Sequence, residues 1–323
     1  MRAAVYRAYG PPDVIGAEEV PAPTPADDEV LVRVVASSVN DFDWHLLTGK
    51  PFVNRAAAGF AKPRLRVLGS DVAGRVTEVG PGVTQLRPGD EVYGDVSPHG
   101  FGAFAEYVTA PASAFARKPA SVSFEQAAAA PQAGGLAVMS LLSRHGIRPG
   151  HRVLVNGAGG GTGTFAVQIA TSFGAEVTAV DAAWKLDGLR AIGAHHVLDY
   201  AVDDFTEAGQ TYDRILDVAA HRPMSAYRRC LRPGGVCAVT GGSIPRVMQI
   251  MALGPVTSAF RSRKVGMPVW RPNDDRDVSF LSRLMDEGSV SPVVDSVYDL
   301  EGIGDAFRRF GAQQHTGKIV LTL

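Results

Sequence analysis

A glycine-rich turn between an apolar run and a helical pattern constrains this chain more than any other feature. Residues 153–170 read VLVNGAGGGTGTFAVQIA. The β-branched run before the glycines predicts a buried strand, and the apolar spacing after them predicts a helix. Glycines at such a turn let the backbone approach a pyrophosphate, and the helix N-terminus offers free N–H groups and the positive end of its dipole. Five glycines within residues 157–163 are more than helix–strand packing alone explains.

The spacing of this turn is that of a dinucleotide-binding site. Ala158-x-Gly160-x-x-Gly163 is the dinucleotide fingerprint with alanine in place of its first glycine. A second strand pattern follows and ends in Asp181, which lies close to the ~20 residues beyond the turn expected for a carboxylate that binds the ribose. We therefore predict dinucleotide binding by a set of turn residues: Ala158, Gly159, Gly160, Gly161, Thr162 and Gly163.

The periodicity of the chain changes near residue 120. Before it, short apolar runs alternate with Pro, Gly and Asp turns, which is typical of a barrel-like all-β domain. From about residue 121 to 245, helix and strand patterns alternate, which predicts a parallel, doubly wound sheet. The 323 residues are enough for roughly two domains. We predict a substrate domain over 1–120, a dinucleotide-binding domain over 121–260, and a C-terminal segment, 261–323, that packs back on the first domain.

Composition excludes several classes of partner and location. The chain has 32 basic and 33 acidic residues, so nothing in its charge favours nucleic acid or an anionic membrane as the main partner. Cys230 and Cys237 cannot form a disulfide framework, which favours a reducing compartment. The first residues read directly as a strand, without a signal peptide, and no run of about 18 apolar residues predicts a membrane span. We therefore expect a cytoplasmic protein.

Several motifs in one order along the chain resemble a known family. They are residues 38–44 (SVNDFDW), 68–74 (LGSDVAG), 102–108 (GAFAEYV), the glycine-rich turn and 317–320 (GKIV). Together they resemble the medium-chain dehydrogenase/reductase superfamily, in its zinc-independent branch of quinone oxidoreductase-like and enoyl reductase-like proteins. The resemblance implies an α/β fold with a GroES-like β-barrel domain and a doubly wound Rossmann domain, with the active site in the cleft between them.

The chain departs from the zinc-dependent relatives where they hold their metal. Those relatives carry a Cys near position 40, a Gly-His-Glu where this chain has Gly69-Ser70-Asp71, and a later Cys. Catalytic zinc needs about three protein ligands and an open position, so we expect no metal site. A further departure is Leu136, where the family often has a Thr in the helix facing the nicotinamide.

The resemblance extends the cofactor site beyond the turn. Tyr200 matches a family tyrosine near the adenosine half of the cofactor, although a rim tyrosine needs no function. Gly241 follows a strand where the family backbone passes the nicotinamide ribose, although a turn glycine is the alternative. Many zinc-independent relatives use NADPH. Asp181 accepts hydrogen bonds from a free ribose hydroxyl and repels a 2′-phosphate, which favours NADH, while Lys185 can offset that repulsion. The cofactor is therefore NAD(P)H, with NADH favoured.

Four residues are candidates for the substrate side of the site. Asn40 and Asp43 lie in the loop that relatives use there, and Asn40 could orient the nicotinamide or the substrate carbonyl. Asp43 could equally cap a helix beginning at Trp44. Tyr93 and His99 are candidates for the pocket wall, and either of them, or water, could donate the proton that completes the reduction.

The leading hypothesis is an NAD(P)H-dependent oxidoreductase that transfers hydride to a quinone or an α,β-unsaturated carbonyl. Such acceptors delocalise charge onto oxygen, so they need little Lewis-acid help. The alternatives are an NAD(P)-dependent alcohol dehydrogenase and a non-catalytic NAD(P)H-binding redox sensor. The expected partner is a flat, conjugated small molecule. The relatives commonly form dimers, so we expect a homodimer; the apolar residues of segment 246–269 could supply the interface or a lid.

Overall fold

The computed structural model describes residues 1–142, 146–259 and 262–323, and leaves out the side chains of residues 57 and 256–259. The chain forms two compact units. Unit 1 comprises Met1–Gln132, Pro272–Asp286 and Pro292–Leu323, and unit 2 comprises Ala133–Arg271 and Glu287–Ser291. The changes of unit at 132/133 and 271/272 lie about a dozen residues beyond the boundaries expected at 120/121 and 260/261.

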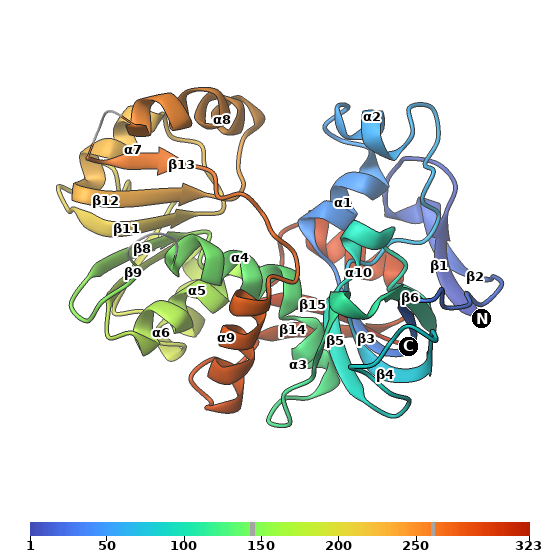
Figure 1. The fold of residues 1–323 in the computed structure, drawn as a ribbon. Helices are drawn as coiled ribbons and strands as arrows, with labels where there is room; N and C mark the ends of the chain where they lie inside the picture. The colour runs from blue at the N-terminus through green and yellow to red at the C-terminus, as the bar shows by residue number, and fades with distance from the viewer. Residues whose placement is uncertain (143–145, 260–261) are drawn as a thin grey trace. The chain divides into compact units, whose positions relative to one another are not determined.

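Unit 2 is built on a parallel six-stranded sheet with the order β10-β9-β8-β11-β12-β13 (Figure 1). The chain enters at β8, adds strands outward to β10, and then returns to the other side of β8 with β11. A sheet with this reversal is doubly wound, and its switch point lies between β8 and β11. The strands are β8 (Arg152–Asn156), β9 (Glu176–Asp181), β10 (His196–Asp199), β11 (Tyr212–Asp217), β12 (Leu231–Val239) and β13 (Lys264–Gly266).

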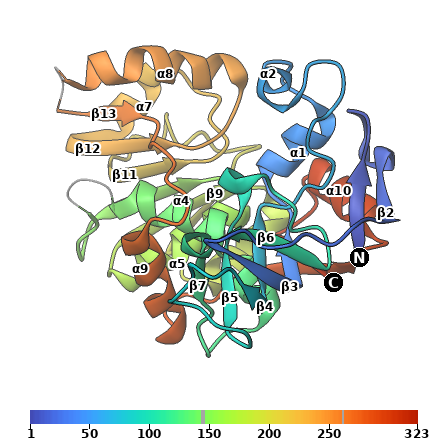
Figure 2. The same cartoon turned by 45° about the vertical axis from the view of Figure 1, so that its right-hand side comes forward.

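Helices flank this sheet as the alternating pattern predicts. The first two after β8 pack against β8, β9 and β10. The last two pack against β12 and β13 (Figure 2). Segment 246–269, expected as interface or lid, supplies most of one of these helices, and residues 260–261 lie outside the described residues. The helices are α4 (Pro131–Leu142), α5 (Gly161–Ser172), α6 (Leu186–Ala191), α7 (Met224–Cys230) and α8 (Ile244–Ala259), with the short 3-10 helix η4 (Ala183–Lys185).

Unit 1 contains a seven-stranded sheet with the order β14-β15-β3-β4-β5-β7, in which β6 also pairs with β3, and a separate hairpin of β1 and β2. The strands are β1 (Arg2–Tyr6), β2 (Ile15–Glu19), β3 (Glu29–Ser38), β4 (Asp71–Val79), β5 (Glu91–Asp95), β6 (Tyr107–Pro111), β7 (Phe115–Arg117), β14 (Val294–Asp299) and β15 (Lys318–Thr322). The helices are α1 (Asp41–Thr48), α2 (Asn54–Ala58), α3 (Phe124–Ala128), α9 (Asp275–Asp286) and α10 (Ile303–Gly311), with 3-10 helices η1 (Pro12–Val14), η2 (Ser97–His99) and η3 (Ala112–Ala114).

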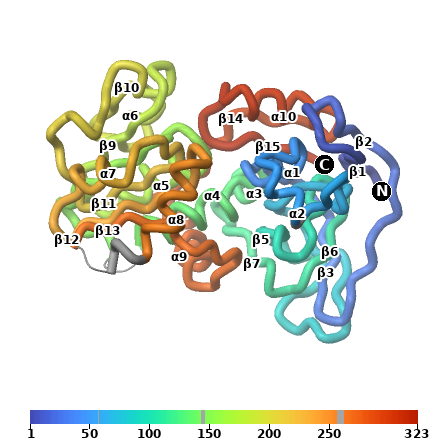
Figure 3. The backbone as a smooth tube through the Cα atoms, turned by 90° about the horizontal axis from the view of Figure 1, so that it is seen from above, coloured from blue at the N-terminus to red at the C-terminus, as the bar shows by residue number. Residues whose placement is uncertain are grey.

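Most of the C-terminal segment belongs to unit 1, over Pro272–Asp286 and Pro292–Leu323. Strand β15 pairs antiparallel with β3, with Leu321 opposite Ser37, and parallel with β14. Helix α10 packs against β2 of the N-terminal hairpin, so the red and blue ends of the chain lie side by side in Figure 3. Residues almost 300 positions apart therefore share one core.

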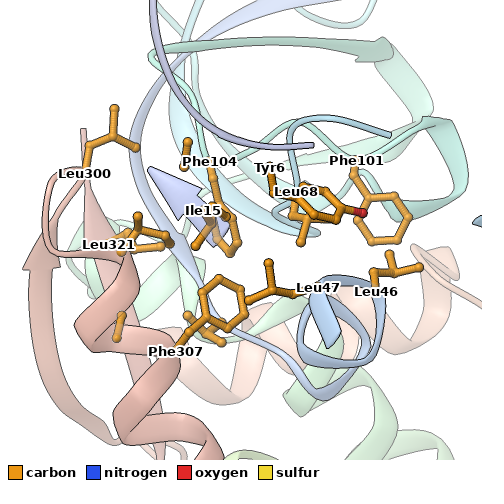
Figure 4. Close-up of a cluster of buried hydrophobic side chains, with 14 of the residues drawn as sticks. Tyr6, Ile15, Leu46, Leu47, Leu68, Phe101, Phe104, Leu300, Phe307 and Leu321 are labelled. Carbon is orange, nitrogen blue, oxygen red and sulfur yellow. The ribbon is translucent and has the colours of Figure 1, made fainter. Parts of the chain in front are cut away.

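That core explains why α1 is firmly held (Figure 4). Leu46 and Leu47 of α1 are buried together with Phe104, Phe307 and Leu321. The rings of Phe104 and Phe307 meet edge to face, with centroids 6.0 Å apart. Burying each large apolar side chain contributes about 1.5–3 kcal/mol, so this cluster fixes the helix and the loop that precedes it. Among the described helices, none is long and apolar enough to cross a membrane.

Candidate active site

The glycine-rich turn lies between β8 and α5. The absence of a side chain serves different physical purposes at its different glycines. A Cβ on Gly163 would stand 2.2 Å from the carbonyl oxygen of Gly157 and 2.6 Å from Cα of Ala158. Gly163 is therefore required by packing between the turn and the helix. A Cβ on Gly160 would meet nothing closer than 3.4 Å. Gly160 thus leaves the surface of the turn open to the close approach of a ligand.

Gly160 is the N-cap of α5, with extended backbone (φ −80°, ψ 177°). Gly161, Thr162 and Gly163 form the first turn of the helix, where backbone N–H groups have no intrahelical carbonyl partner. These N–H groups and the helix dipole suit an anion such as a pyrophosphate. Ala158 is fully buried beneath the turn, which places a methyl group where the fingerprint usually has its first glycine.

Asp181 holds the glycine-rich turn in place. One of its carboxylate oxygens, Oδ2, accepts a hydrogen bond from the backbone N–H of Gly159 at 2.7 Å. The other, Oδ1, accepts from Ala182 N–H at 2.8 Å and lies 3.4 Å from the Nζ of Lys185. The side chains of Asp181 and Lys185 are only 9% and 8% exposed. The carboxylate expected to bind the ribose therefore already has protein partners, a feature that residue spacing could not reveal.

The residues expected at the adenosine side gather beside this carboxylate. Lys185 occupies the space over Gly159, where a Cβ would stand 2.5 Å from its Cδ, and its Nζ lies 5.0 Å from the ring centroid of Trp184. The backbone N–H of Tyr200 donates to the carbonyl of Asp181 at 3.2 Å, and the side chain of Tyr200 is 60% exposed. The structure thus brings Asp181, Lys185 and Tyr200 together at the carboxyl ends of β9 and β10.

Gly241 lies in the loop after β12, where packing accounts for the absence of a side chain. A Cβ there would stand 2.6 Å from the carbonyl oxygen of Val218. Sequence analysis missed a buried pair beside this loop: Nδ2 of Asn156, at the end of β8, donates to Asp217, at the end of β11, at 2.8 Å. Burial raises the pKa of Asp217. This pair joins the carboxyl ends of β8 and β11, the two strands on either side of the switch point.

In unit 1, α1 begins at Asp41 rather than at Trp44, and Asn40 is its N-cap. This corrects the expectation that Asp43 caps a helix beginning at Trp44. Asp43 is instead the third residue of the helix, and its carboxylate accepts from the backbone N–H of Asn40 at 3.0 Å and of Gly69 at 3.0 Å. Asp43 is fully buried, and these two hydrogen bonds tie the loop before α1 to the segment before β4.

The amide of Asn40 is bound on both sides by buried groups. Its Nδ2 donates to Asp71 Oδ2 at 2.9 Å and to Ser70 Oγ at 3.0 Å, and its Oδ1 accepts from the ammonium of Lys318. These contacts hold the amide in one orientation. A direct contact of Asn40 with the nicotinamide or the substrate, which sequence analysis considered, stays a prediction.

Asp43 and Asn40 belong to a larger buried cluster that sequence analysis did not foresee. Asp43, Asp71, Asp95 and Lys318 are each less than 5% exposed, and Lys318 Nζ lies 3.6 Å from Asp71 Oδ2. Burial raises the pKa of Asp43 to about 7 and that of Asp71 to about 6, and it also raises the pKa of Asp95. Burial lowers the pKa of Lys318. The signals in the sequence were the motifs that contain Asp43, Asp71 and Lys318, which are far apart along the chain.

Tyr93 and His99 differ in their surroundings. Tyr93, on β5, is buried, and its hydroxyl lies 2.7 Å from Ser282 Oγ. Desolvation raises the pKa of Tyr93 to about 12, so this hydroxyl keeps its proton in the interior. His99, in η2, is exposed. Proton donation by Tyr93, His99 or water remains a prediction.

Comparison with known proteins places this arrangement in a family. Residues 26–120 match the alcohol dehydrogenase GroES-like domain, and residues 192–321 match the family described as zinc-binding dehydrogenase. The chain is 32% identical to the chloroplast envelope quinone oxidoreductase homolog of Arabidopsis thaliana, over 99% of this chain and 98% of that protein. The chain belongs to the medium-chain dehydrogenase/reductase superfamily, in its quinone oxidoreductase-like branch.

Two further relatives bear on the activity. The chain is 32% identical to the NADPH-dependent alkenal/one oxidoreductase, chloroplastic, of Arabidopsis thaliana, over 99% of this chain and 79% of that protein. A solved structure described as an NAD-dependent alcohol dehydrogenase superposes with a TM-score of 0.83 at 30% identity, over all of both chains. The predicted fold class, a GroES-like domain with a Rossmann domain, is confirmed, as is the enzyme class of an NAD(P)H-dependent quinone or enone oxidoreductase.

One of the two matching families is described as zinc-binding dehydrogenase, so the residues that could hold a metal ion bear on the function. Within 1–142, 146–259 and 262–323, no group of three His, Cys, Asp or Glu side chains is placed to hold a metal ion. Where zinc-dependent relatives have histidine, this chain has Ser70, whose hydroxyl donates to Asp43 at 3.2 Å. The buried Asp43 and Asp71 in this region are bonded to amide, hydroxyl and ammonium groups of the protein.

Proposed function

We propose that the protein binds NAD(P)H along the turn between β8 and α5 and delivers hydride to a flat conjugated carbonyl compound or quinone. The observation that carries this proposal is the open surface at Gly160, beside the N–H groups of the first turn of α5. When bound, the cofactor supplies hydride from C4 of its nicotinamide ring. The chain's own residues then have three tasks: to hold the cofactor, to orient the acceptor and to provide or relay a proton.

The residues present fit these tasks as follows. Gly161, Thr162 and Gly163 would hold the pyrophosphate through backbone N–H groups. Lys185 and Tyr200, beside Asp181, would hold the adenosine half. The quinone- and enone-reducing relatives support a conjugated acceptor, since reduction of such a compound spreads negative charge onto an oxygen without a Lewis acid.

Alcohol dehydrogenation is the second candidate, because the solved structure at 30% identity carries that description. The two functions separate in one set of assays. We expect NADH or NADPH oxidation with phenanthrenequinone or an aryl enone, and little reduction of NAD(P)⁺ with ethanol, propanol or benzyl alcohol. Faster turnover of an alcohol than of any quinone or enone would replace the proposal with alcohol dehydrogenation. Tight cofactor binding without turnover of either class would indicate a redox sensor.

The contacts of Asp181 and Lys185 predict how cofactor preference is set. Sequence analysis favoured NADH because of Asp181, and we retain that preference but expect it to be modest, since the carboxylate is paired with Lys185 at 3.4 Å. Asp181→Asn keeps an oxygen for Gly159 N–H and frees Lys185 for a 2′-phosphate. Lys185→Met removes that cation. A charged hydrogen bond contributes about 1.5–3 kcal/mol, or roughly 10- to 100-fold.

We therefore expect the two substitutions to move the ratio of kcat/KM for NADPH to that for NADH in opposite directions. Asp181→Asn should raise the ratio about tenfold or more, and Lys185→Met should lower it by a similar factor. The exposed Arg190→Met, one turn along α6 from this site, is the control. A shift of both variants in the same direction would mean that the pair acts through the shape of the turn rather than through its charge.

A further inference from the structure

A short lobe of unit 1 carries exposed apolar side chains. The lobe comprises residues 50–66, with α2 and the loops on either side of it, and it stands above α1, away from β3, β4 and β5, in Figure 1. Phe52, Val53 and Phe60 are 58%, 71% and 68% exposed. The rings of Phe52 and Phe60 meet edge to face, with centroids 5.1 Å apart. We call these three side chains the apolar tip of the lobe.

Contacts within unit 1 hold the lobe in a defined shape. The hydroxyl of Tyr9 donates to the carbonyl of Gly59 at 2.5 Å, and Tyr9 packs against the core that holds α1. The guanidinium of Arg55 lies over the ring of Tyr9, 4.5 Å from its centroid, and its Nε donates to the carbonyl of Gly49 at 3.1 Å. The apolar tip is therefore presented to solvent by an ordered scaffold.

The charge of the lobe has one sign. Residues 44–70 contain five Lys or Arg and no Asp or Glu, although the whole chain has a net charge of −1. Four of these cations are exposed, and among the described residues none of the four is paired with a carboxylate: Lys50, Lys62, Arg64 and Arg66. Cations around exposed apolar side chains complement a lipid surface, which is anionic outside and apolar beneath.

We propose that this lobe docks the protein reversibly on an anionic lipid surface. The apolar tip enters the boundary between headgroups and acyl chains, and the exposed cations of the lobe contact the lipid phosphates. Each Lys or Arg near such a surface contributes about fivefold to binding. The proposal does not depend on the proposed function. It would bring the enzyme to apolar quinones and enones, because such compounds dissolve in bilayers.

The test of the charges uses the full-length protein and vesicles of equal parts phosphatidylglycerol and phosphatidylcholine. We expect the protein to pellet with these vesicles at low salt, to be released at high salt, and not to pellet with phosphatidylcholine alone. Lys62→Gln combined with Arg64→Gln should weaken binding by about 25-fold. Arg33→Gln combined with Arg276→Gln is the control, because it removes the same charge from exposed positions of β3 and α9. Equal losses in the two double variants would overturn the proposal.

The apolar tip is tested separately. Phe52→Ser combined with Phe60→Ser should weaken binding by at least about tenfold, since burial of large apolar side chains is lost. Val53→Ser should weaken it by a smaller factor. Val297→Ser is the matched control for Val53, because Val297 is 50% exposed in β14 of unit 1, and should leave binding unchanged. Undiminished binding in the double Phe variant would overturn insertion of the tip.

A labelled cysteine reports whether the tip itself meets lipid. Cys230 and Cys237 are buried, and burial raises the pKa of both thiols, so a maleimide dye should react selectively with Phe60→Cys. A polarity-sensitive dye at position 60 should shift its emission to the blue when the anionic vesicles are added. The same dye on Val297→Cys should not.

These readouts need no turnover, so they remain valid if the protein reduces neither quinones nor enones. Three results would overturn the proposal. They are a thiol at position 60 that maleimide does not reach in the folded protein, a dye there whose emission stays unchanged with vesicles, and binding to polyglutamate but not to the anionic vesicles. The last result would indicate an acidic protein partner instead of lipid.

Discussion

Gly160→Val abolishes NAD(P)H binding and turnover while the protein stays folded. The backbone at Gly160 is extended, which valine adopts readily, and an added Cβ would approach the protein no closer than 3.4 Å. The valine side chain would instead fill the open surface beside the first turn of α5, where we place the pyrophosphate. We expect a loss of more than about 100-fold in cofactor affinity, from the combined loss of several charge-assisted hydrogen bonds. Fluorescence titration with NADH and NADPH measures it.

Two other glycines provide controls for this substitution. Gly16→Val, in β2 of unit 1, places the same side chain where a Cβ would have no neighbour within 4 Å, and should leave binding and turnover unchanged. Gly163→Ala should lower the melting temperature instead, since its Cβ would lie 2.2 Å from a backbone oxygen. Tight NAD(P)H binding by Gly160→Val would show that the pyrophosphate site is elsewhere.

Lys318→Met causes the largest loss of stability that we expect from a single substitution. The ammonium of Lys318 is the cation within the cluster of Asp43, Asp71 and Asp95, all of them buried. Removing one partner of a buried charge pair typically costs about 3–5 kcal/mol, because the remaining charge is left uncompensated. We expect this loss in the free energy of unfolding at pH 8. Urea unfolding followed by tryptophan fluorescence measures it.

The pH dependence identifies the cause of this loss. Burial raises the pKa of Asp71 to about 6, and Lys318 counteracts that rise. A carboxyl group with a raised pKa contributes stability that is present at low pH and lost as pH rises through that pKa. Without Lys318 the pKa of Asp71 rises further, so the deficit of Lys318→Met should shrink as pH falls from 8 to 5.

The added substitution Asp71→Asn should recover part of the stability of Lys318→Met at pH 8, because it removes one of the uncompensated charges. Lys62→Met, at an exposed lysine of unit 1, is the control and should change stability by less than about 0.5 kcal/mol. A loss in Lys318→Met that is the same at pH 5 and pH 8, and that Asp71→Asn does not reduce, would assign the effect to lost packing rather than to charge.

The sequence was sufficient for the features that depend on local pattern. The glycine spacing after an apolar run predicted the β8–turn–α5 unit. The alternation of helix and strand predicted the parallel sheet. Each of these rests on residues a few positions apart, whose geometry the chain's periodicity fixes.

Features that depend on distant partners were beyond the sequence. Lys318 reaches Asn40 across 278 positions, and no local pattern shows that a lysine on the last strand is buried beside three carboxylates. Residue spacing placed Asp181 at the end of a strand but could not show that its carboxylate turns toward Gly159 N–H. The beginning of α1 was misplaced because Asn40 and Asp43 share the capping role. Reciprocal caps of this kind depend on side-chain contacts that are seen only in three dimensions.

The measurement that tests the proposed function most directly follows the transferred hydride itself. NADH or NADPH carrying deuterium at nicotinamide C4, in each stereochemical position in turn, is incubated with the enzyme and an aryl enone, and the product is analysed by mass spectrometry. We expect one deuterium at the β-carbon of the saturated ketone, from one of the two positions only, and no transfer with Gly160→Val. Formation of an allylic alcohol with deuterium at the carbonyl carbon, or no deuterium transfer to any enone or quinone, would contradict the proposal.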